Sequence, residues 1–262
     1  MAFRKLFPHP VFGILTDKIR VRDFVRDRLG ESFLVPVYDI TSDIESFSFE
    51  SLPSSFVMKA NHGCEWTELV SDKDSVDTEL LRQKARRWLA QNFYDTHRER
   101  HYKSISPQIM FERLLTDRGQ PPKDYKINCF RKNGILTQIV QVHSDRIANH
   151  KVNFFSHDWT PIRMDHGYPS APCNELLRPD NLRQMLAAAE VLSEGFNFVR
   201  VDLYSVEGRI YFGEMTFTPG AGGLRFNPVE MDEMWGSLFE PDPSHFSRHR
   251  ISNMSCIGVT SR

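Results

Sequence analysis

The sequence predicts a protein of the α+β class, and three features of its 262 residues lead to that class. Strand-like segments occur in pairs around short turns, and helical segments stand between the pairs. The strict strand–helix–strand alternation of a parallel sheet is missing. Hydrophobic residues make up 40% and charged residues 26% of the chain, which is typical of a globular protein with a buried core.

The first half of the chain contains one expected helix, one strand pair and then a second helix. Apolar residues at helical spacing predict a helix that begins at Thr16-Asp17 and ends at Gly30. A strand is expected over residues 33–39, and a connection with one short helical turn over 41–54. The segments SFVMKA and TELVS flank the loop NHGCEW and predict a hairpin. A helix over 77–93 and a strand over 108–115 follow.

The second half opens with a strong hairpin signal. Residues 125–131 and 135–143 flank Lys132-Asn133-Gly134, and Asn-Gly favours the positive φ angles of a tight turn. A helix is expected over 179–195, between an early proline and a final glycine. Residues 198–204 and 209–217 predict another hairpin about Glu207-Gly208, and a short helix is expected over 228–239.

Composition and charge exclude several classes of protein. With 33 basic and 34 acidic side chains, the net charge is −1, so the excess of Lys and Arg typical of nucleic-acid binders is missing. The four cysteines form no CxxC pair, which favours reduced thiols and a cytoplasmic location. No apolar run approaches the ~20 residues of a membrane span, and the N-terminus does not resemble a signal peptide. We expect a soluble, cytoplasmic protein of enzyme size.

Asp202 and Glu214 are the most informative polar residues, because each lies within an apolar strand pattern where an unpaired carboxylate is costly. If the turn has the three residues 206–208, Asp202 lies opposite Phe212 and Glu214 is a neighbour on the same face. Two carboxylates from one hairpin suit Mg²⁺, which takes one or two protein carboxylates plus phosphate oxygens. A pair of structural, salt-bridged carboxylates remains the alternative. Arg200 points to the same face, where it can hold a phosphate or simply neutralise Asp202.

Other candidates are weaker on their own. Lys59 ends an apolar strand beside a loop and can reach a phosphate, although an exposed lysine is the commoner case. Glu112 lies within an apolar strand, and Lys18 reads as an ordinary helix residue. His97 and His101 share a helix face without the HExxH zinc pattern, and neither a P-loop nor a GxSxG nucleophile motif occurs.

Six segments, taken in order, resemble the TupA-like branch of the ATP-grasp superfamily, from about Thr16 to about Phe239. They are TDKIRVRDFV, FVMKANHG, IMFERLL, DYKINCF, QVHSDR with NFFSHDW, and FVRVDLYSVEGRIYFGEMTFTPG followed by FNP. The resemblance implies the ATP-grasp fold, in which two α+β subdomains clasp ATP between two antiparallel sheets. It implies a division into an N-terminal helix and strand region (1–50), a small subdomain (51–115) and a C-terminal subdomain with the metal hairpin (116–262).

The resemblance also assigns roles to residues that match the family's motifs. Asp202 and Glu214 match the magnesium ligands, and Arg200 matches the arginine that steadies the transferred phosphate, with Lys59 as its catalytic partner. ATP contacts are implied for Lys18, Lys59, Glu112, Arg113, Leu114 and Asp124. Asp145, Arg146, Arg225 and Asn227 are candidate contacts to the substrate.

Three departures from the family pattern stand out. The loop that covers the phosphates reads NHGCEWTELV where relatives resemble NHGSGGN, so we expect a stiffer loop. Thr216 occupies the position where most of the superfamily has Asn as a further metal ligand, although threonine is typical of this branch. The TDK motif lies close to the start of the sequence, so we expect a shorter N-terminal region than relatives have.

The activity implied is that of an ATP- and Mg²⁺-dependent carboxylate–amine ligase that works through an acylphosphate. The TupA-like branch is associated with bacterial surface polysaccharides, notably teichuronopeptide, so the expected partners are an amine or amino acid and a carboxylate-bearing sugar or glycan. The alternative is a glycosyltransferase, for which Asp72-Lys73-Asp74 fits a D-x-D metal string, although a solvated helix cap is the more common role. A carbohydrate-binding module without a metal site is a third possibility.

Overall fold

The computed structural model describes residues 1–145 and 149–240, which form two compact units. The first unit consists of residues 1–22 and 34–116, and the second of residues 23–33 together with the described part of 117–262. Helix α3 (Val21–Leu29) therefore begins in one unit and continues in the other. The three-part division at 50 and 115 stays a prediction. No helix in the described part of the chain is long and apolar enough to span a membrane.

The first unit is built on a four-stranded antiparallel sheet with the order β1-β4-β2-β3. Its strands are β1 (Val37–Thr41), β2 (Phe56–Ala60), β3 (Thr67–Val70) and β4 (Ile109–Glu112). Its α-helices are α1 (Ala2–Leu6), α2 (Pro10–Thr16), α4 (Thr78–Leu89) and α5 (Phe93–His97). Short 3₁₀ turns are η2 (Phe49–Ser51), η3 (Lys73–Ser75) and η4 (Arg100–Tyr102).

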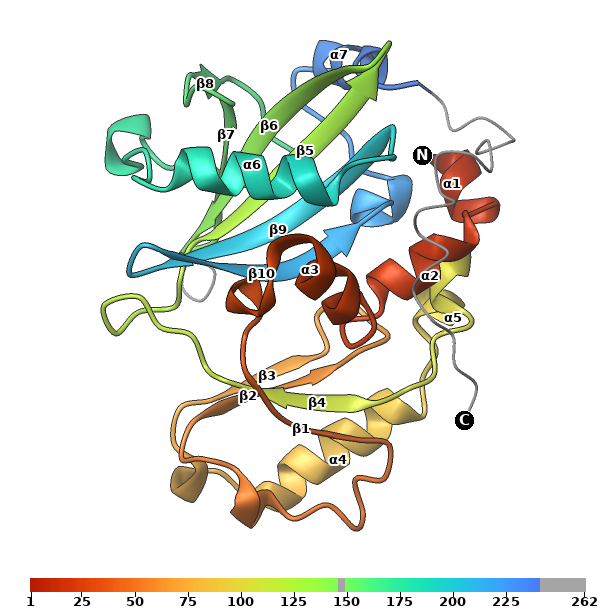
Figure 1. Ribbon diagram of the computed structural model, residues 1–262, viewed down its shortest axis with the longest axis vertical. Coiled ribbons are helices and arrows are strands. Elements are labelled where there is room, and N and C mark those ends of the chain that lie inside the picture. The colour runs from red at the N-terminus through yellow and green to blue at the C-terminus, as the bar shows by residue number, and fades with distance from the viewer. Residues whose placement is uncertain (146–148, 241–262) are drawn as a thin grey trace. The chain divides into compact units, whose positions relative to one another are not determined.

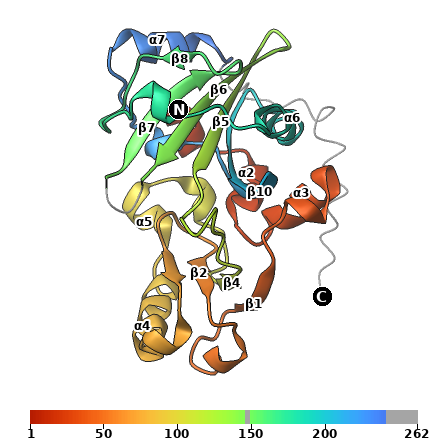
Figure 2. The ribbon, with the colours of Figure 1, turned by 90° about the vertical axis from the view of Figure 1, so that its left-hand side faces the viewer.

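Helix α4 covers one face of this sheet (Figures 1 and 2). Its residues Leu81 and Ala85 pack in one apolar cluster with Phe56 and Met58 of β2 and with Phe111 of β4. Because neighbouring residues of a strand point to opposite faces, the other face of β2 and β4 presents the residues between these core positions. That second face carries the candidate polar residues of the first unit.

The second unit is built on a six-stranded antiparallel sheet with the order β10-β9-β5-β6-β7-β8. Its strands are β5 (Asp124–Lys132), β6 (Ile135–Ser144), β7 (Lys151–Ser156), β8 (Pro161–Ile162), β9 (Phe198–Val206) and β10 (Arg209–Thr216). Besides the greater part of α3, its helices are α6 (Leu182–Leu192) and α7 (Glu230–Ser237), with the turns η1 (Glu31–Phe33), η5 (Cys173–Glu175) and η6 (Pro219–Gly222).

Helix α6 packs on β5 and β9, as Figure 1 shows. Its Met185 and Ala189 are fully buried, and the thiol of Cys129 in β5 lies 3.7 Å from the carbonyl oxygen of Ala189. Burial raises the pKa of that thiol to about 11, so Cys129 is a neutral core residue. The opposite face carries Asp202, and on that face Phe130 of β5 and Phe154 of β7 pack against Trp235 of α7.

The α+β class and the hairpins are confirmed, while several boundaries predicted from the sequence are wrong. The turn at Asn133-Gly134 has the two positive φ angles expected, 51° and 79°. The helix expected from Thr16-Asp17 begins at Val21 instead, because the Asp17 carboxylate accepts hydrogen bonds from the amides of Ile19 and Arg20 in a separate turn. The strand expected over 33–39 occupies Val37–Thr41.

The helix expected over 77–93 is likewise shorter. Asp77 caps α4 by accepting a hydrogen bond from the amide of Glu79 at 2.8 Å, and the helix ends at Leu89. A second helix, α5, begins at Phe93 with Asn92 as its cap. Two capping side chains within sixteen residues therefore divide the segment in two.

Candidate functional site

The hairpin of β9 and β10 turns through two residues, not through the three residues of the predicted geometry. Glu207 and Gly208 have φ angles of 50° and 79°, and Val206 pairs directly with Arg209. In a regular ladder continued from this turn, Asp202 would lie opposite Gly213, and Glu214 would point to the other face of the sheet. The expected position of Phe212 opposite Asp202 is therefore wrong, because Phe212 pairs with Leu203.

A β-bulge at Gly213 restores the two carboxylates to one face. The register shifts between Phe212 and Glu214, so that Glu214 pairs directly with Asp202. A Cβ atom at Gly213 would lie 3.1 Å from the backbone oxygen of Asp202 and 3.2 Å from the ring of Tyr204. The close approach of the two strands at this point therefore depends on glycine.

Arg200 links the polar residues of this hairpin. Its Nε donates to Asp202 Oδ1 at 2.7 Å, and its terminal nitrogen lies 2.9 Å from Asp202 Oδ2, 3.1 Å from Glu214 Oε1 and 2.9 Å from the hydroxyl of Thr216. Burial by itself lowers the pKa of Arg200, but the carboxylates of Asp202 and Glu214 raise it above its ordinary value. The guanidinium thus holds both carboxylates in place.

Lys126 of β5 is a second cation, and it is not among the site residues predicted from the sequence. It is only 7% exposed, it pairs with Asp202 across the sheet, and its ammonium group contacts the carboxylate of Asp202. It also lies 2.8 Å from Oδ2 of Asp124, a candidate ribose contact that is itself buried. Burial opposes the charge on Lys126, but Asp124 and Asp202 together raise its pKa.

The donors on this face fit Mg²⁺. Asp202, Glu214 and Thr216 offer carboxylate and hydroxyl oxygens from adjacent strands, and Mg²⁺ prefers oxygen ligands. Among the described residues, no group of three His, Cys, Asp or Glu side chains has the geometry of a metal site. A metal bound here would therefore complete its coordination with phosphate oxygens and water, as Mg²⁺ commonly does.

A network of histidines continues the same face on β6. The amide nitrogen of Gln141, which pairs with Lys126 across the sheet, lies 2.8 Å from Nε2 of His143 and 2.8 Å from Nε2 of His166. His143 Nδ1 lies 2.8 Å from Nε2 of His150. Burial lowers the pKa of His166, so that its imidazole is neutral at pH 7. No spacing in the sequence signals this network, because its members come from separate segments.

In the first unit, two of the candidate ATP-binding residues form an ion pair. Lys59 of β2 and Glu112 of β4 lie on the face away from α4, and the ammonium group of Lys59 contacts Oε1 of Glu112. The two residues that follow Glu112 are only partly buried, and the amide of Arg113 donates to the carbonyl oxygen of Pro36 at 2.9 Å, while Leu114 lies next to it. The structure thus brings Lys59 and Glu112 together on one surface.

The loop after Lys59 is held at several points. Asn61 is fully buried and donates to Asp17 Oδ1 and to the carbonyl oxygen of Ser106, each at 3.0 Å. Lys18 donates to the carbonyl oxygen of Gly63. The ring of Trp66 lies so close to Gly63 that a Cβ there would approach it to 2.4 Å. A tryptophan therefore packs where relatives are expected to have glycine, and the stiffer loop stays a prediction.

The candidate substrate contacts are scattered on the second unit. Asp145 is exposed, with a φ angle of 49°, and Arg146 lies outside the described residues. Arg225 is exposed, and the side chain of Asn227 donates to Asp165 Oδ2 at 2.9 Å. Since His166 follows Asp165, the bond from Asn227 fixes the segment that carries one of the network histidines.

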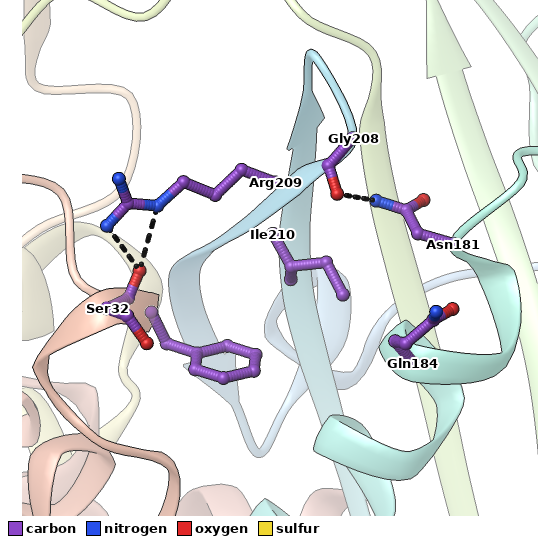
Figure 3. A pocket seen from close by; sticks show the side chains of 7 residues that line it. Ser32, Asn181, Gln184, Gly208, Arg209 and Ile210 are labelled. Carbon is purple, nitrogen blue, oxygen red and sulfur yellow. Dashed lines mark hydrogen bonds between the residues drawn. The ribbon is translucent and has the colours of Figure 1, made fainter.

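Two other features do not belong to this site. Asp72 caps the short η3 turn by accepting from the amide of Asp74 at 3.2 Å, as expected of a solvated cap. A pocket of about 200 Å³, shown in Figure 3, is lined by Ser32, Phe33, Asn181, Gln184, Gly208, Arg209 and Ile210. Ile210 pairs with Ser205, whose side chain bonds to Asn181 beside α6, so this pocket opens on the sheet face opposite the carboxylates.

Comparison with known proteins gives one family and several distant structures. A family model described as TupA-like ATPgrasp matches residues 6–240. No curated protein matches the chain.

Three solved structures illustrate the distant similarity. D-Alanine–D-alanine ligase from Helicobacter pylori is 13% identical over 92% of this chain and 60% of its own, with a TM-score of 0.45. D-Alanyl-alanine synthetase A from Vibrio cholerae is 14% identical over 94% of this chain and 66% of its own, with a TM-score of 0.47. Phosphoribosylamine–glycine ligase from Thermotoga maritima is 9% identical over 80% of this chain and 50% of its own, with a TM-score of 0.48. The chain thus spans between half and two thirds of the length of these proteins.

Proposed function

The chain belongs to the TupA-like ATP-grasp family, and from this membership we propose that it is an ATP- and Mg²⁺-dependent carboxylate–amine ligase. The reaction would form an acylphosphate from a carboxylate and ATP, and then an amide from the acylphosphate and an amine. The observation that carries the proposal is the pair of the buried Asp202 and the partly buried Glu214, held on one face by the Gly213 bulge and by Arg200.

In the first step, a carboxylate oxygen of the substrate attacks the γ-phosphorus of ATP, and the bond to ADP breaks. Asp202 and Glu214 would hold Mg²⁺, which neutralises phosphate charge when it is bound. Arg200 is planar and always charged, so it can donate to the oxygens of the phosphoryl group in transfer. Lys59 and Lys18 are proposed to contact the phosphates of ATP, and Glu112, Arg113, Leu114 and Asp124 to contact its adenosine.

In the second step, the nitrogen of the amine attacks the acyl carbon, phosphate leaves with its bonding electron pair, and the nitrogen loses a proton. Much of the acceleration in such a reaction comes from holding the reactants in place and from fixed charges. On the same face, the amide nitrogen of Gln141 lies at hydrogen-bond distance from His143 and His166, and burial lowers the pKa of His166.

For the substrates we propose an amino acid or other amine and a uronic-acid-containing bacterial surface glycan or its precursor, joined in the cytoplasm. The association of the TupA-like branch with such polymers supports this assignment. Asp145, Arg146, Arg225 and Asn227 remain the candidate contacts to these substrates.

The first test is release of ADP by the purified protein supplied with ATP, Mg²⁺, a uronate and a panel of amino acids. We expect ADP to appear only when both substrates and Mg²⁺ are present. Asp202→Asn and Glu214→Gln should each reduce the rate by at least about 100-fold, because each removes a charged metal ligand. Full activity of both variants would exclude the proposed metal site.

The alternative function, a glycosyltransferase, depends on Asp72 and Asp74 as metal ligands. Both are exposed, and Asp72 is engaged in capping η3. In the same assay, Asp72→Asn should leave ADP release unchanged. If it abolished transfer of a sugar while Asp202→Asn did not, the glycosyltransferase would be the better assignment.

A further inference from the structure

We propose that Lys126 stays ion-paired with the carboxylate of Asp202 until a nucleotide binds. The protein then binds a divalent metal ion only weakly when nucleotide is absent. This inference rests on the proposed function for the identity of the metal site. It assigns to Lys126 a role as a positioning residue, which controls when Asp202 becomes available as a ligand.

The contacts of Asp202 support this role. Oδ1 accepts from Nε of Arg200 at 2.7 Å, and Oδ2 accepts both from the second nitrogen of Arg200 and from the ammonium group of Lys126. Asp202 and Lys126 are 2% and 7% exposed, so water screens these contacts little. Oδ2 already has two cationic donors for its two lone pairs, so a metal that binds this oxygen must displace Lys126 or Arg200 from it.

The charges of the cluster point the same way. Three carboxylates, those of Asp124, Asp202 and Glu214, are joined by ion pairs to the two cations Lys126 and Arg200, which gives these five residues a net charge of −1. A bare dication therefore meets a net charge of only −1, and loss of the charge on Lys126 would double that net charge to −2. At the effective dielectric of about 20 typical of proteins, one unit of charge at contact distance changes the affinity for a dication by more than about tenfold.

Nucleotide changes this balance. The phosphates of ATP bring several negative charges and many acceptor oxygens, and a lysine is a flexible cation with three donors. Lys126 can turn from Asp202 to a phosphate oxygen without losing a partner. The carboxylate of Asp202 then binds the metal ion in place of the ammonium group of Lys126. The metal ion and the nucleotide therefore bind together.

The test measures binding of Mn²⁺ alone, by electron paramagnetic resonance of the free ion, to the full chain without nucleotide. Lys126→Gln removes the charge and keeps a polar side chain, while Lys126→Arg keeps the charge. Lys132→Gln is the matched control, because Lys132 lies on the same strand but donates to the carbonyl oxygen of Ser237. Lys126→Gln/Asp202→Asn tests whether any added binding uses Asp202.

We expect Lys126→Gln to bind Mn²⁺ at least about tenfold more tightly than the unmodified protein, with Lys126→Arg and Lys132→Gln unchanged and the double variant without the gain. Equal binding by Lys126→Gln and the unmodified protein, or an equal gain from Lys132→Gln, would overturn the inference. Far-ultraviolet circular dichroism verifies folding, and Lys126→Met replaces Lys126→Gln if that variant is unfolded.

A separate arm distinguishes this inference from the proposed function. Binding of a non-hydrolysable ATP analogue with Mn²⁺ to the unmodified protein tests the nucleotide site itself. If the analogue binds and Lys126→Gln shows no gain, only the inference about Lys126 fails. If the analogue does not bind at all, the proposed ligase function fails.

Discussion

Burial lowers or raises the pKa of several single residues, and His101 is one of them. It is 4% exposed, it packs edge-on against Phe12, and burial lowers its pKa to about 4. In the unfolded chain a histidine has a pKa of about 6.5. At a pH between these two pKa values, the imidazole of His101 is therefore protonated in the unfolded state and neutral in the folded state.

This difference predicts a loss of stability in acid. The contribution of His101 is fully present above pH 6.5 and declines as the pH falls toward 4, by about 3 kcal/mol in total. Urea denaturation at pH 7.5 and 4.5 should show a smaller loss for His101→Phe than for the unmodified protein. His157→Gln, which changes an exposed histidine, serves as the control, and an equal loss in both variants would contradict the prediction.

The sequence identifies some site residues and misses others for physical reasons. Asp202 and Glu214 are visible because a carboxylate in an apolar strand demands a partner. Lys126 is a charged residue in the same kind of strand, but it becomes informative only when the register places it opposite Asp202. Gln141 and its histidines cannot be found from spacing, because the strand pairing and the folded segment around Asp165 bring them together.

Among the elements, the β9–β10 hairpin shows most clearly where local prediction ends. The turn residues Glu207-Gly208 are recognisable in the sequence. The face that Glu214 occupies, however, depends both on the number of residues in the turn and on the bulge at Gly213. The two departures from the assumed geometry compensate, so the pair predicted for one face does lie on one face. Helix ends are better encoded, since Asp77 and Asn92 each cap the helix that follows them.

The bulge supplies a prediction at this scale. In Gly213→Val the new side chain meets backbone oxygen at close range, so the hairpin must shift, which we expect to cost about 1–3 kcal/mol of stability. The midpoint temperature of thermal unfolding should fall, and Mg²⁺ should stimulate ADP release less than in the unmodified protein. Gly236→Ala is the control, because no atom lies within 4 Å of a Cβ built there in α7. Normal values for Gly213→Val would show that the strands do not require this close approach.

On the scale of the whole molecule, the two units are each built from two separated parts of the chain. The sequence shows the change from one strand pair to the next near residue 116. It does not show that residues 23–33 group with the second unit, because the same apolar pattern of α3 would serve either. Long-range grouping of this kind depends on tertiary contacts that no local pattern records.

Nucleotide binding predicts stabilisation of the folded chain. A ligand that binds only the folded state at 100 times its Kd adds about 2.7 kcal/mol of stability. Thermal unfolding with a non-hydrolysable ATP analogue should therefore shift upward, and the shift should be larger with Mg²⁺ than with EDTA. In Asp202→Asn/Glu214→Gln the difference between Mg²⁺ and EDTA should disappear. A difference that persisted in this variant would place the metal elsewhere.

The hairpin with its two-residue turn also affects how the same site can be recognised in other sequences. Its arms are unequal, since β9 runs four positions from Val206 to Asp202, whereas β10 runs five positions from Arg209 to Glu214. A relative without the extra glycine would bring the equivalent glutamate opposite the aspartate with one residue fewer between them. A search pattern with a fixed interval between the two acids would reject that relative, and an alignment should be free to open a gap at Gly213.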